Sequence, residues 1–123
     1  MLIATLTAPI LLWWIMVGKR DIRLKDVEKE IDIGNDVSEG ISFHDDIIVI
    51  RQQETIMAYE AKCTHLGCRI SKAEGDELVC PCHGSRFNTR GQAVKGPAKD
   101  PLKTLSVQTD PLSGNIIIVR NDV

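Results

Sequence analysis

The sequence is poor in aromatic side chains, which make up only 4% of its 123 residues. Any hydrophobic core must therefore be built mainly from aliphatic residues. The sequence also has no excess of basic residues, because its formal net charge at pH 7 is -2. Nucleic acids are bound through clustered positive charge, so nothing in this composition points to a nucleic-acid partner. At this length the chain has room for one domain and little more.

Residues 31–123 also lack any long amphipathic helical period. Short runs rich in β-branched residues stand in its place, separated by turn-forming residues. Residues 46–51 and 55–61 predict a hairpin, and residues 102–108 and 115–120 flank a second turn. This pattern predicts a small antiparallel β domain, a sandwich or partial barrel, in place of a helical one.

Cysteine and histidine are scarce and unevenly placed. The chain has four cysteines and three histidines, and residues 63–97 hold all four cysteines and two of the histidines. Because this segment lies between the two predicted strand pairs, we expect an excursion built from loops, and loops on a rigid frame commonly carry binding sites. The third histidine, His44, stands beside Asp45 and Asp46, and we expect it to be a surface residue near a turn.

Two short motifs in this segment combine cysteine with histidine. We name CTHLGC, residues 63–68, the first box and CPCHGS, residues 80–85, the second box. One cysteine and one histidine from each box form a four-ligand set that suits either structural zinc or a [2Fe–2S] cluster with mixed ligands. Common zinc fingers run Cys, Cys, His, His, whereas these ligands alternate, which favours the cluster. The four candidate ligands are Cys63, His65, Cys80 and His83.

One further cysteine remains in each box. Free thiols beside a zinc site would compete as ligands, whereas a disulfide would limit how far two loops that grip one cluster can separate. We therefore expect a disulfide between Cys68 and Cys82. Gly67 and Gly84 would let the backbone approach the sulfur atoms closely.

The two boxes resemble those of the Rieske iron–sulfur protein of cytochrome bc complexes. The resemblance continues at residues 96–98, Gly-Pro-Ala, which are similar to the loop that covers the cluster in that family. It implies an all-β fold, namely a small antiparallel β-sandwich with an inserted cluster-binding subdomain at about residues 63–97, and one [2Fe–2S] cluster per chain. It also implies further residues around the cluster, which are Leu66, Gly67, Ser85, Phe87 and Pro97.

The function that this resemblance implies is one-electron transfer from a quinol. In that family the two histidines ligate the outer iron, and His83 is the one expected to accept a hydrogen bond from the quinol hydroxyl, with His65 beside it. The electron would then pass to a cytochrome c-type haem. The expected partners are a quinol, cytochrome b-type and cytochrome c-type subunits, and the membrane, as in a quinol–cytochrome c oxidoreductase-type complex.

Phe87 departs from the family pattern. In that family the serine equivalent to Ser85 donates a hydrogen bond to a bridging sulfide, and a tyrosine two residues later donates one to a cluster cysteine. Such donors stabilise the reduced cluster and raise its potential. Because Phe87 has no hydroxyl, we expect a reduction potential below that of relatives with tyrosine, which would suit a low-potential quinol such as menaquinol.

The amino-terminal residues predict a membrane anchor. Residues 2–18 carry no charge and have two adjacent tryptophans near their end, which favours one transmembrane helix over residues 1–18. A cleaved signal peptide would need a basic start and a small-residue cleavage site, and neither is evident. The charged residues 19–30 would tether this anchor to a head at 31–123.

The expected orientation in the membrane involves two opposing signals. Basic residues directly after the anchor usually stay inside, but the expected disulfide needs an oxidising compartment. We give more weight to the disulfide and expect a single-pass protein of the cell membrane with its head on the periplasmic side.

Other functions remain open at this stage. A soluble Rieske ferredoxin or oxygenase fragment would share the ligand spacing but generally lacks the extra cysteine pair. A complete oxygenase also needs a mononuclear iron held by two histidines and a carboxylate, and only His44 remains for such a site. Rieske subunits also serve arsenite-oxidising and other respiratory assemblies, and a structural zinc module is the last alternative.

Overall fold

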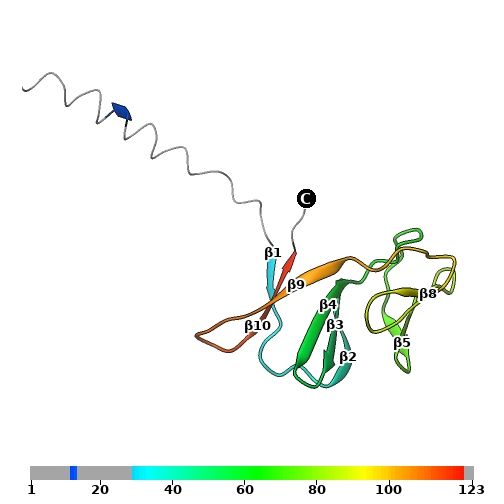
Figure 1. The fold of residues 1–123 in the computed structure, drawn as a ribbon, viewed down its shortest axis with the longest axis horizontal. Helices are drawn as coiled ribbons and strands as arrows, with labels where there is room; N and C mark the ends of the chain where they lie inside the picture. Colours follow the sequence, from blue (N-terminus) through cyan, green and yellow to red (C-terminus); the bar gives the residue numbers. More distant parts are fainter. Residues whose placement is uncertain (1–11, 14–28, 121–123) are drawn as a thin grey trace, which may run out of the picture.

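The computed structural model describes Leu12, Trp13 and residues 29–120 of the chain. Over these residues it contains ten short strands in two antiparallel sheets (Figure 1). The expectation of an all-β domain with antiparallel strands is therefore confirmed. Nearly all of the expected anchor and most of the expected tether lie outside the described residues. Within the described residues, no helix is long and apolar enough to cross a membrane.

The larger sheet has six strands in the order β1-β10-β9-β4-β3-β2. Each neighbouring pair is antiparallel, and β9 joins the two halves of the sheet by pairing with both β10 and β4. The strand pairs predicted at 46–51 with 55–61 and at 102–108 with 115–120 are both present in this sheet. Its strands are β1 (Lys29–Asp32), β2 (Gly40–His44), β3 (Ile47–Gln52), β4 (Thr55–Glu60), β9 (Thr104–Thr109) and β10 (Ile116–Arg120).

Strand β1 begins at Lys29, so it includes the last two residues of the segment 19–30, which the sequence predicted as a tether. Only Ile31 of this strand is partly buried, and it lies opposite Ile118 of β10. A strand with one inward-facing apolar residue leaves no alternation to recognise in the sequence. The charged residues at its start therefore resembled a solvated connector.

Strand β3 is buried along most of its length. Ile47, Ile48, Val49 and Ile50 are each 0% exposed. Because successive side chains of a strand point to opposite faces, these four residues contribute to two different cores. Ile47 and Val49 belong to the core formed within the larger sheet, whereas Ile48 and Ile50 belong to the core shared with the segment that carries the two boxes.

The segment that carries the boxes forms one end of the domain, opposite the β9–β10 hairpin (Figure 1). It contains a smaller sheet of four strands in the order β5-β6-β7-β8, so the expectation of an excursion built only from loops is wrong. These strands have two or three residues each, which is too short for a period of two to be visible in the sequence. They are β5 (Lys72–Glu74), β6 (Glu77–Val79), β7 (Arg86–Phe87) and β8 (Ala93–Lys95).

We predict that Ile48→Ala destabilises the domain by about 2–5 kcal/mol, the usual cost of truncating a fully buried isoleucine. Ile48 lies in the core between the larger sheet and the boxes, so its removal leaves a cavity there. Ile117→Ala is the matched control, because Ile117 is only partly buried and belongs to neither core. Urea unfolding measures both variants, and an equal loss of unfolding free energy would contradict the role of β3 described above.

Candidate metal centre

The first box follows β4 and forms a closed six-residue loop. The backbone N–H of Cys63 donates to the carbonyl of Cys68 at 2.8 Å, and the N–H of Gly67 donates to the carbonyl of Cys63 at 2.9 Å. The first and sixth residues of the box are thereby held together. The side chains between them, including that of His65, are directed by the loop and not by a strand.

The second box, which follows β6, repeats this frame. The N–H of Cys80 donates to the carbonyl of Ser85 at 2.9 Å, and the N–H of Gly84 donates to the carbonyl of Cys80 at 3.2 Å. The fifth residue of each box is a glycine with positive φ, +78° at Gly67 and +77° at Gly84, a conformation that glycine adopts without steric cost. The chain therefore builds two loops of the same shape from two different sequences.

The candidate ligands divide into a buried pair and an exposed pair. The side chains of Cys63 and Cys80 contact each other, are nearly fully buried and form no disulfide. The imidazoles of His65 and His83 are exposed and lie edge to face, with ring centroids 5.0 Å apart. A centre between the two loops would therefore meet sulfur on its inner side and nitrogen on its outer side.

Burial raises the pKa of the Cys63 thiol above its ordinary value. The neighbouring Cys80 acts in the same direction, whereas hydrogen bonds to the sulfur from the backbone of His65 and the hydroxyl of Ser85 act against it. The thiolate is the form that binds metal, so metal binding at Cys63 would release a proton.

A disulfide joins the two boxes. It links Cys68 to Cys82, as the sequence predicted. The sulfur atoms of these two residues and of Cys80 all lie within 4.8 Å of one another. Three cysteines at this spacing could hold a metal ion, but the disulfide occupies two of them, which leaves Cys80 as the candidate ligand. The disulfide also fixes the distance between the two loops, so the paired arrangement of ligands does not depend on the metal alone.

The loop at residues 96–98 is tied to the second box. Ser85 is fully buried, and its hydroxyl oxygen accepts a hydrogen bond from the backbone N–H of Ala98 at 3.0 Å. Because that oxygen accepts one bond and the hydroxyl proton is donated to the Cys63 sulfur, Ser85 connects this loop to a candidate ligand of the first box. The sequence identified Ser85 and Pro97 as site residues but gave no signal that Ala98 connects them.

A second hydrogen bond ties the same loop to the first box. The hydroxyl of Thr64 donates to the carbonyl of Asp100 at 2.8 Å. A cleft of about 350 Å³ opens beside this bond, lined by residues that include His65, Pro97 and Lys99. Sequence reasoning missed Thr64, although a hydroxyl-bearing residue between a candidate thiol ligand and a candidate imidazole ligand was a usable signal.

The other predicted site residues have contrasting environments. Phe87 is fully buried in the core behind the boxes, where its ring contributes apolar contact only. Leu66, next to His65 in the chain, is 69% exposed. A Cβ at Gly67 would lie 3.0 Å from Cε of Lys62, so this glycine also leaves room for the lysine side chain.

His44 does not join the two histidines of the boxes. It lies at the end of β2, next to the turn at residues 45–46, as expected. Its side chain is half-buried rather than fully on the surface, and its Nε2 lies 3.2 Å from Oγ of Ser42. Both features are consistent with a role in local packing.

Ion pairs cross the smaller sheet beneath the second box. Arg86 of β7 contacts Glu74 at 2.6 Å and Glu77 at 2.9 Å, and Lys72 contacts Glu74 at 2.8 Å. Lys72 and then Arg86 lower the pKa of Glu74 from 4.5 to about 2. These side chains are between 28% and 64% exposed, so the pairs align three short strands more than they stabilise the domain.

We predict that Glu74→Gln makes the acid dependence of stability shallower between about pH 4.5 and pH 2. Because the folded state holds the pKa of Glu74 below its ordinary value, the ionised carboxylate adds stability above pH 4.5, and this contribution is lost as the pH falls toward 2. Urea midpoints measured over this range test the difference. Glu54→Gln is the control, because Glu54 is exposed and forms no ion pair among the described residues. Parallel profiles for wild type and Glu74→Gln would contradict the prediction.

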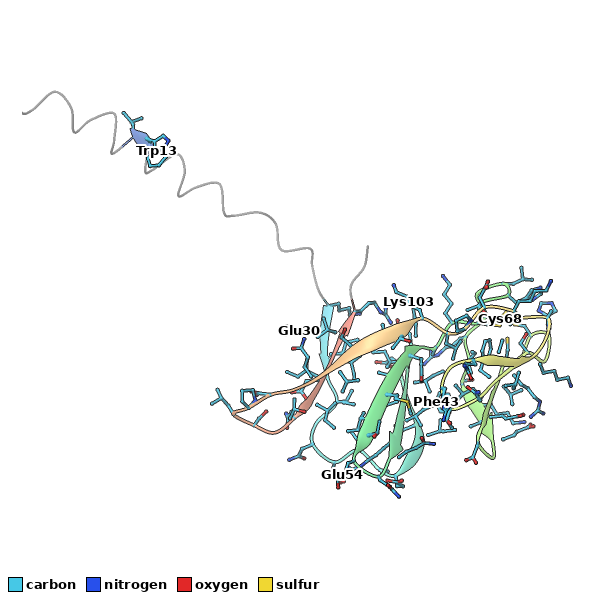
Figure 2. All side chains as sticks on the ribbon, in the orientation of Figure 1. Trp13, Glu30, Phe43, Glu54, Cys68 and Lys103 are labelled. Carbon is cyan, nitrogen blue, oxygen red and sulfur yellow. A yellow bond between two sulfur atoms is a disulfide. The ribbon has the colours of Figure 1, made fainter. Side chains whose placement is uncertain are left out.

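The donor set fits a centre with mixed ligands. Two adjacent buried thiols offer soft ligands in a nearly dry environment, and two exposed imidazoles offer borderline ligands in contact with solvent. Figure 2 shows Cys68 among these loops, at the end of the domain that lies away from Glu54 in the β3–β4 turn. Both a zinc ion and a [2Fe–2S] cluster accept two thiolates and two imidazoles, so the donors alone do not choose between them.

Comparisons with known proteins distinguish these two kinds of centre. Residues 19–106 match the family described as the Rieske [2Fe-2S] domain. The chain is similar to the chloroplastic cytochrome b6-f complex iron-sulfur subunit of Triticum aestivum, with 35% identity over 86 residues that cover 68% of this chain and 38% of that protein. It is also similar to the cytochrome b6-f complex iron-sulfur subunit of Chlorobaculum tepidum, with 35% identity over 89 residues that cover 71% and 48%. The match thus spans less than half the length of each relative.

Solved structures show the same similarity. The plasma membrane Rieske protein PetC3 from Synechocystis PCC 6803 matches with a TM-score of 0.57 and 29% identity, over 73% of this chain and 98% of that one. A naphthalene 1,2-dioxygenase matches with a TM-score of 0.61 over 84% of this chain and 28% of that one, but at 19% identity, so this likeness concerns the fold alone.

Proposed function

Because the chain belongs to the Rieske [2Fe-2S] domain family and therefore carries a [2Fe–2S] cluster, we propose that it takes one electron from a quinol, with release of a proton, and passes it to a cytochrome c-type haem. The observation that carries this proposal is the exposure of His65 and His83 on loops whose candidate thiol ligands are buried. When bound, the cluster supplies a one-electron couple, and ligation by two histidines raises its potential above that of all-cysteine clusters. Because these imidazoles are exposed, they provide a place at the protein surface where an electron can enter or leave.

The proposal assigns the cluster to two cysteines and two histidines. Cys63 and Cys80 would hold one iron as thiolates, and His65 and His83 would hold the other. The contact between the two thiols and the 5.0 Å spacing of the two rings support this division. Other residues of the site shape its surroundings, and these are Leu66, Gly67, Ser85, Phe87 and Pro97.

The proposal gives His83 the contact with the quinol. One ring nitrogen of this histidine is used as a ligand, and the other remains free to accept a hydrogen bond from the quinol hydroxyl. As the electron leaves the quinol, the proton moves to that nitrogen. His65 lines the cleft next to Pro97, which leaves space beside its ring for a substrate. Thiolates buried in the core could not reach the substrate in this way.

The proposed partners and location follow from the relatives and the disulfide. The relatives named above are subunits of cytochrome b6-f complexes, which supports cytochrome b-type and cytochrome c-type partners for this chain. A structural disulfide forms and persists in oxidising compartments, so we place the head on the periplasmic side of the cell membrane. Residues 1–18 would anchor it, and the charged segment 19–30, whose last two residues belong to β1, would tether it.

A test of the function is a redox titration of the full-length chain, followed by electron paramagnetic resonance at several pH values. We expect a [2Fe–2S] signal in the reduced state, with a midpoint potential that falls as the pH rises because reduction favours protonation of the histidine ligands. Absence of the signal, together with one zinc per chain in metal analysis, would mean that the boxes hold a structural metal. A midpoint that stays constant up to strongly alkaline pH would count against histidine ligation.

The full burial of Phe87 behind the cluster loops leads to a second prediction. Phe87→Tyr is expected to raise the midpoint potential by tens of millivolts, on the scale of about 59 mV for a tenfold change in a one-electron equilibrium, because the new hydroxyl can donate to a cluster sulfur. The same titration measures it. Phe43→Tyr is the control, because Phe43 is only partly buried, on edge strand β2, outside the boxes. An unchanged potential in Phe87→Tyr would mean that Phe87 serves packing alone.

A further inference from the structure

The described domain separates its charges by position. We define the cluster end as residues 61–103 and the base as residues 29–60 and 104–120. The cluster end has eight Lys and Arg against four Asp and Glu, a formal net charge of +4. The base has three Lys and Arg against nine Asp and Glu, a formal net charge of -6. A whole-chain net charge of -2 conceals this separation.

Ion pairing within the cluster end leaves its positive charge largely uncompensated. Glu74 and Glu77 pair with Lys72 and Arg86, so two of the four acidic groups neutralise two of the eight basic ones. The other six basic side chains are exposed and form no ion pair with any described residue. They are Lys62, Arg69, Arg90, Lys95, Lys99 and Lys103.

Several of these side chains lie close to the exposed histidines. Lys99 lines the same cleft as His65. Lys62 extends over Gly67 of the first box, and Arg69 directly follows that box and donates to the backbone of Asp45. These basic side chains therefore lie at the same end of the domain as the exposed histidines. Acidic residues lie near three of them, because Asp100 lines the cleft with Lys99, and Asp46 and Glu60 line a pocket with Lys62 and Arg69.

We propose that the cluster end docks on an acidic surface of the protein that accepts the electron, an inference that rests on the proposed electron-transfer function. A quinol carries no charge, so the six basic side chains that form no ion pair with a described residue would not attract it. An acidic partner would be attracted to the cluster end and repelled by the base, and both effects turn the histidines toward it. The polarity of the domain thus orients the encounter as well as accelerating it.

The surface chemistry fits a protein partner better than a lipid surface. Leu66 is 69% exposed, and the first box that carries it is flanked in the chain by Lys62 and Arg69, which matches an apolar contact within a polar rim. Membrane-surface segments present a continuous apolar face of tryptophan, phenylalanine and leucine beside the basic residues, whereas the exposed large hydrophobics among the described residues of the cluster end are Leu66 and Val94. No aromatic ring other than the two imidazoles is exposed at the cluster end of the described domain, where the remaining aromatic residue, Phe87, is fully buried.

The test uses the purified full-length chain with its cluster and two soluble c-type cytochromes, one with acidic and one with basic residues around the haem edge. The dissociation constant and the electron-transfer rate constant are measured from about 10 mM to about 100 mM salt, over which the Debye length falls from about 30 Å to about 10 Å. We expect the rate with the acidic cytochrome to fall about tenfold or more over this range. The rate with the basic cytochrome should be lower and should rise with salt.

Matched variants locate the effect on the surface. The first double variant combines Lys62→Gln with Lys99→Gln at the cluster end, and the second combines Gln52→Glu with Gln108→Glu at the base. Each makes the net charge more negative by two units. Gln52 and Gln108 are exposed residues of the base, in β3 and β9. We expect the first pair to weaken binding to the acidic cytochrome several-fold at low salt and the second pair to have little effect. Unfolding curves check that both variants remain folded.

Three outcomes would overturn the inference. They are a rate that does not depend on salt, tighter binding to the basic cytochrome, and equal effects of the two double variants. Vesicles of phosphatidylglycerol and phosphatidylcholine test the lipid alternative. If the chain binds them and the Lys62 and Lys99 double variant does not, the partner of the cluster end is a membrane and not a protein. The dissociation constant does not require turnover, so it decides the inference even if quinol fails to reduce the cluster, a result that would count against the proposed function alone.

Discussion

The domain depends on the burial of a single strand from both sides. Apolar burial stabilises proteins by roughly 25 cal/mol per Å², and a chain with few aromatic residues must obtain this from aliphatic side chains in close contact. Strand β3 supplies four of them in succession, two to each core. The strands β5 to β8 have only two or three residues each, and sheets of such short strands need packing against a further layer to be stable.

On this support the two boxes hold their side chains by backbone geometry. Each loop closes through the same two hydrogen bonds and the same glycine conformation, and the disulfide fixes one loop relative to the other. The loop at residues 96–98 is then tied down through Ser85 and its neighbour at residues 99–100 through Thr64. Because the buried thiols and the exposed rings belong to the same loops, the interior and the surface of the domain are connected at the place where the chemistry is proposed to occur.

The sequence predicted the parts of this arrangement that depend on residue type. Long β-branched runs predicted β3, β4, β9 and β10, and the crowding of cysteine and histidine predicted the boxes and the disulfide. The smaller sheet was not predictable, because two- and three-residue strands have no period and are stabilised by contacts distant in sequence. The bond from Ala98 to Ser85 was hidden for a different reason, since a backbone donor is the same in every residue. The charge separation was present in the sequence, but it required the fold to show which residues share an end.

The identical frames of the two boxes have a consequence for how such a centre can change over time. Histidine is the third residue of the first box and the fourth of the second, while the bridging cysteine is the sixth residue of one and the third of the other. The frame itself is made of backbone bonds and one glycine, so it does not depend on which side chain stands at the intervening positions. The identity of a ligand residue is thus independent of the shape of its loop, so a mutation can substitute the ligand while the loop keeps its backbone conformation. A scaffold of this kind can explore different metal chemistries while it keeps the same architecture.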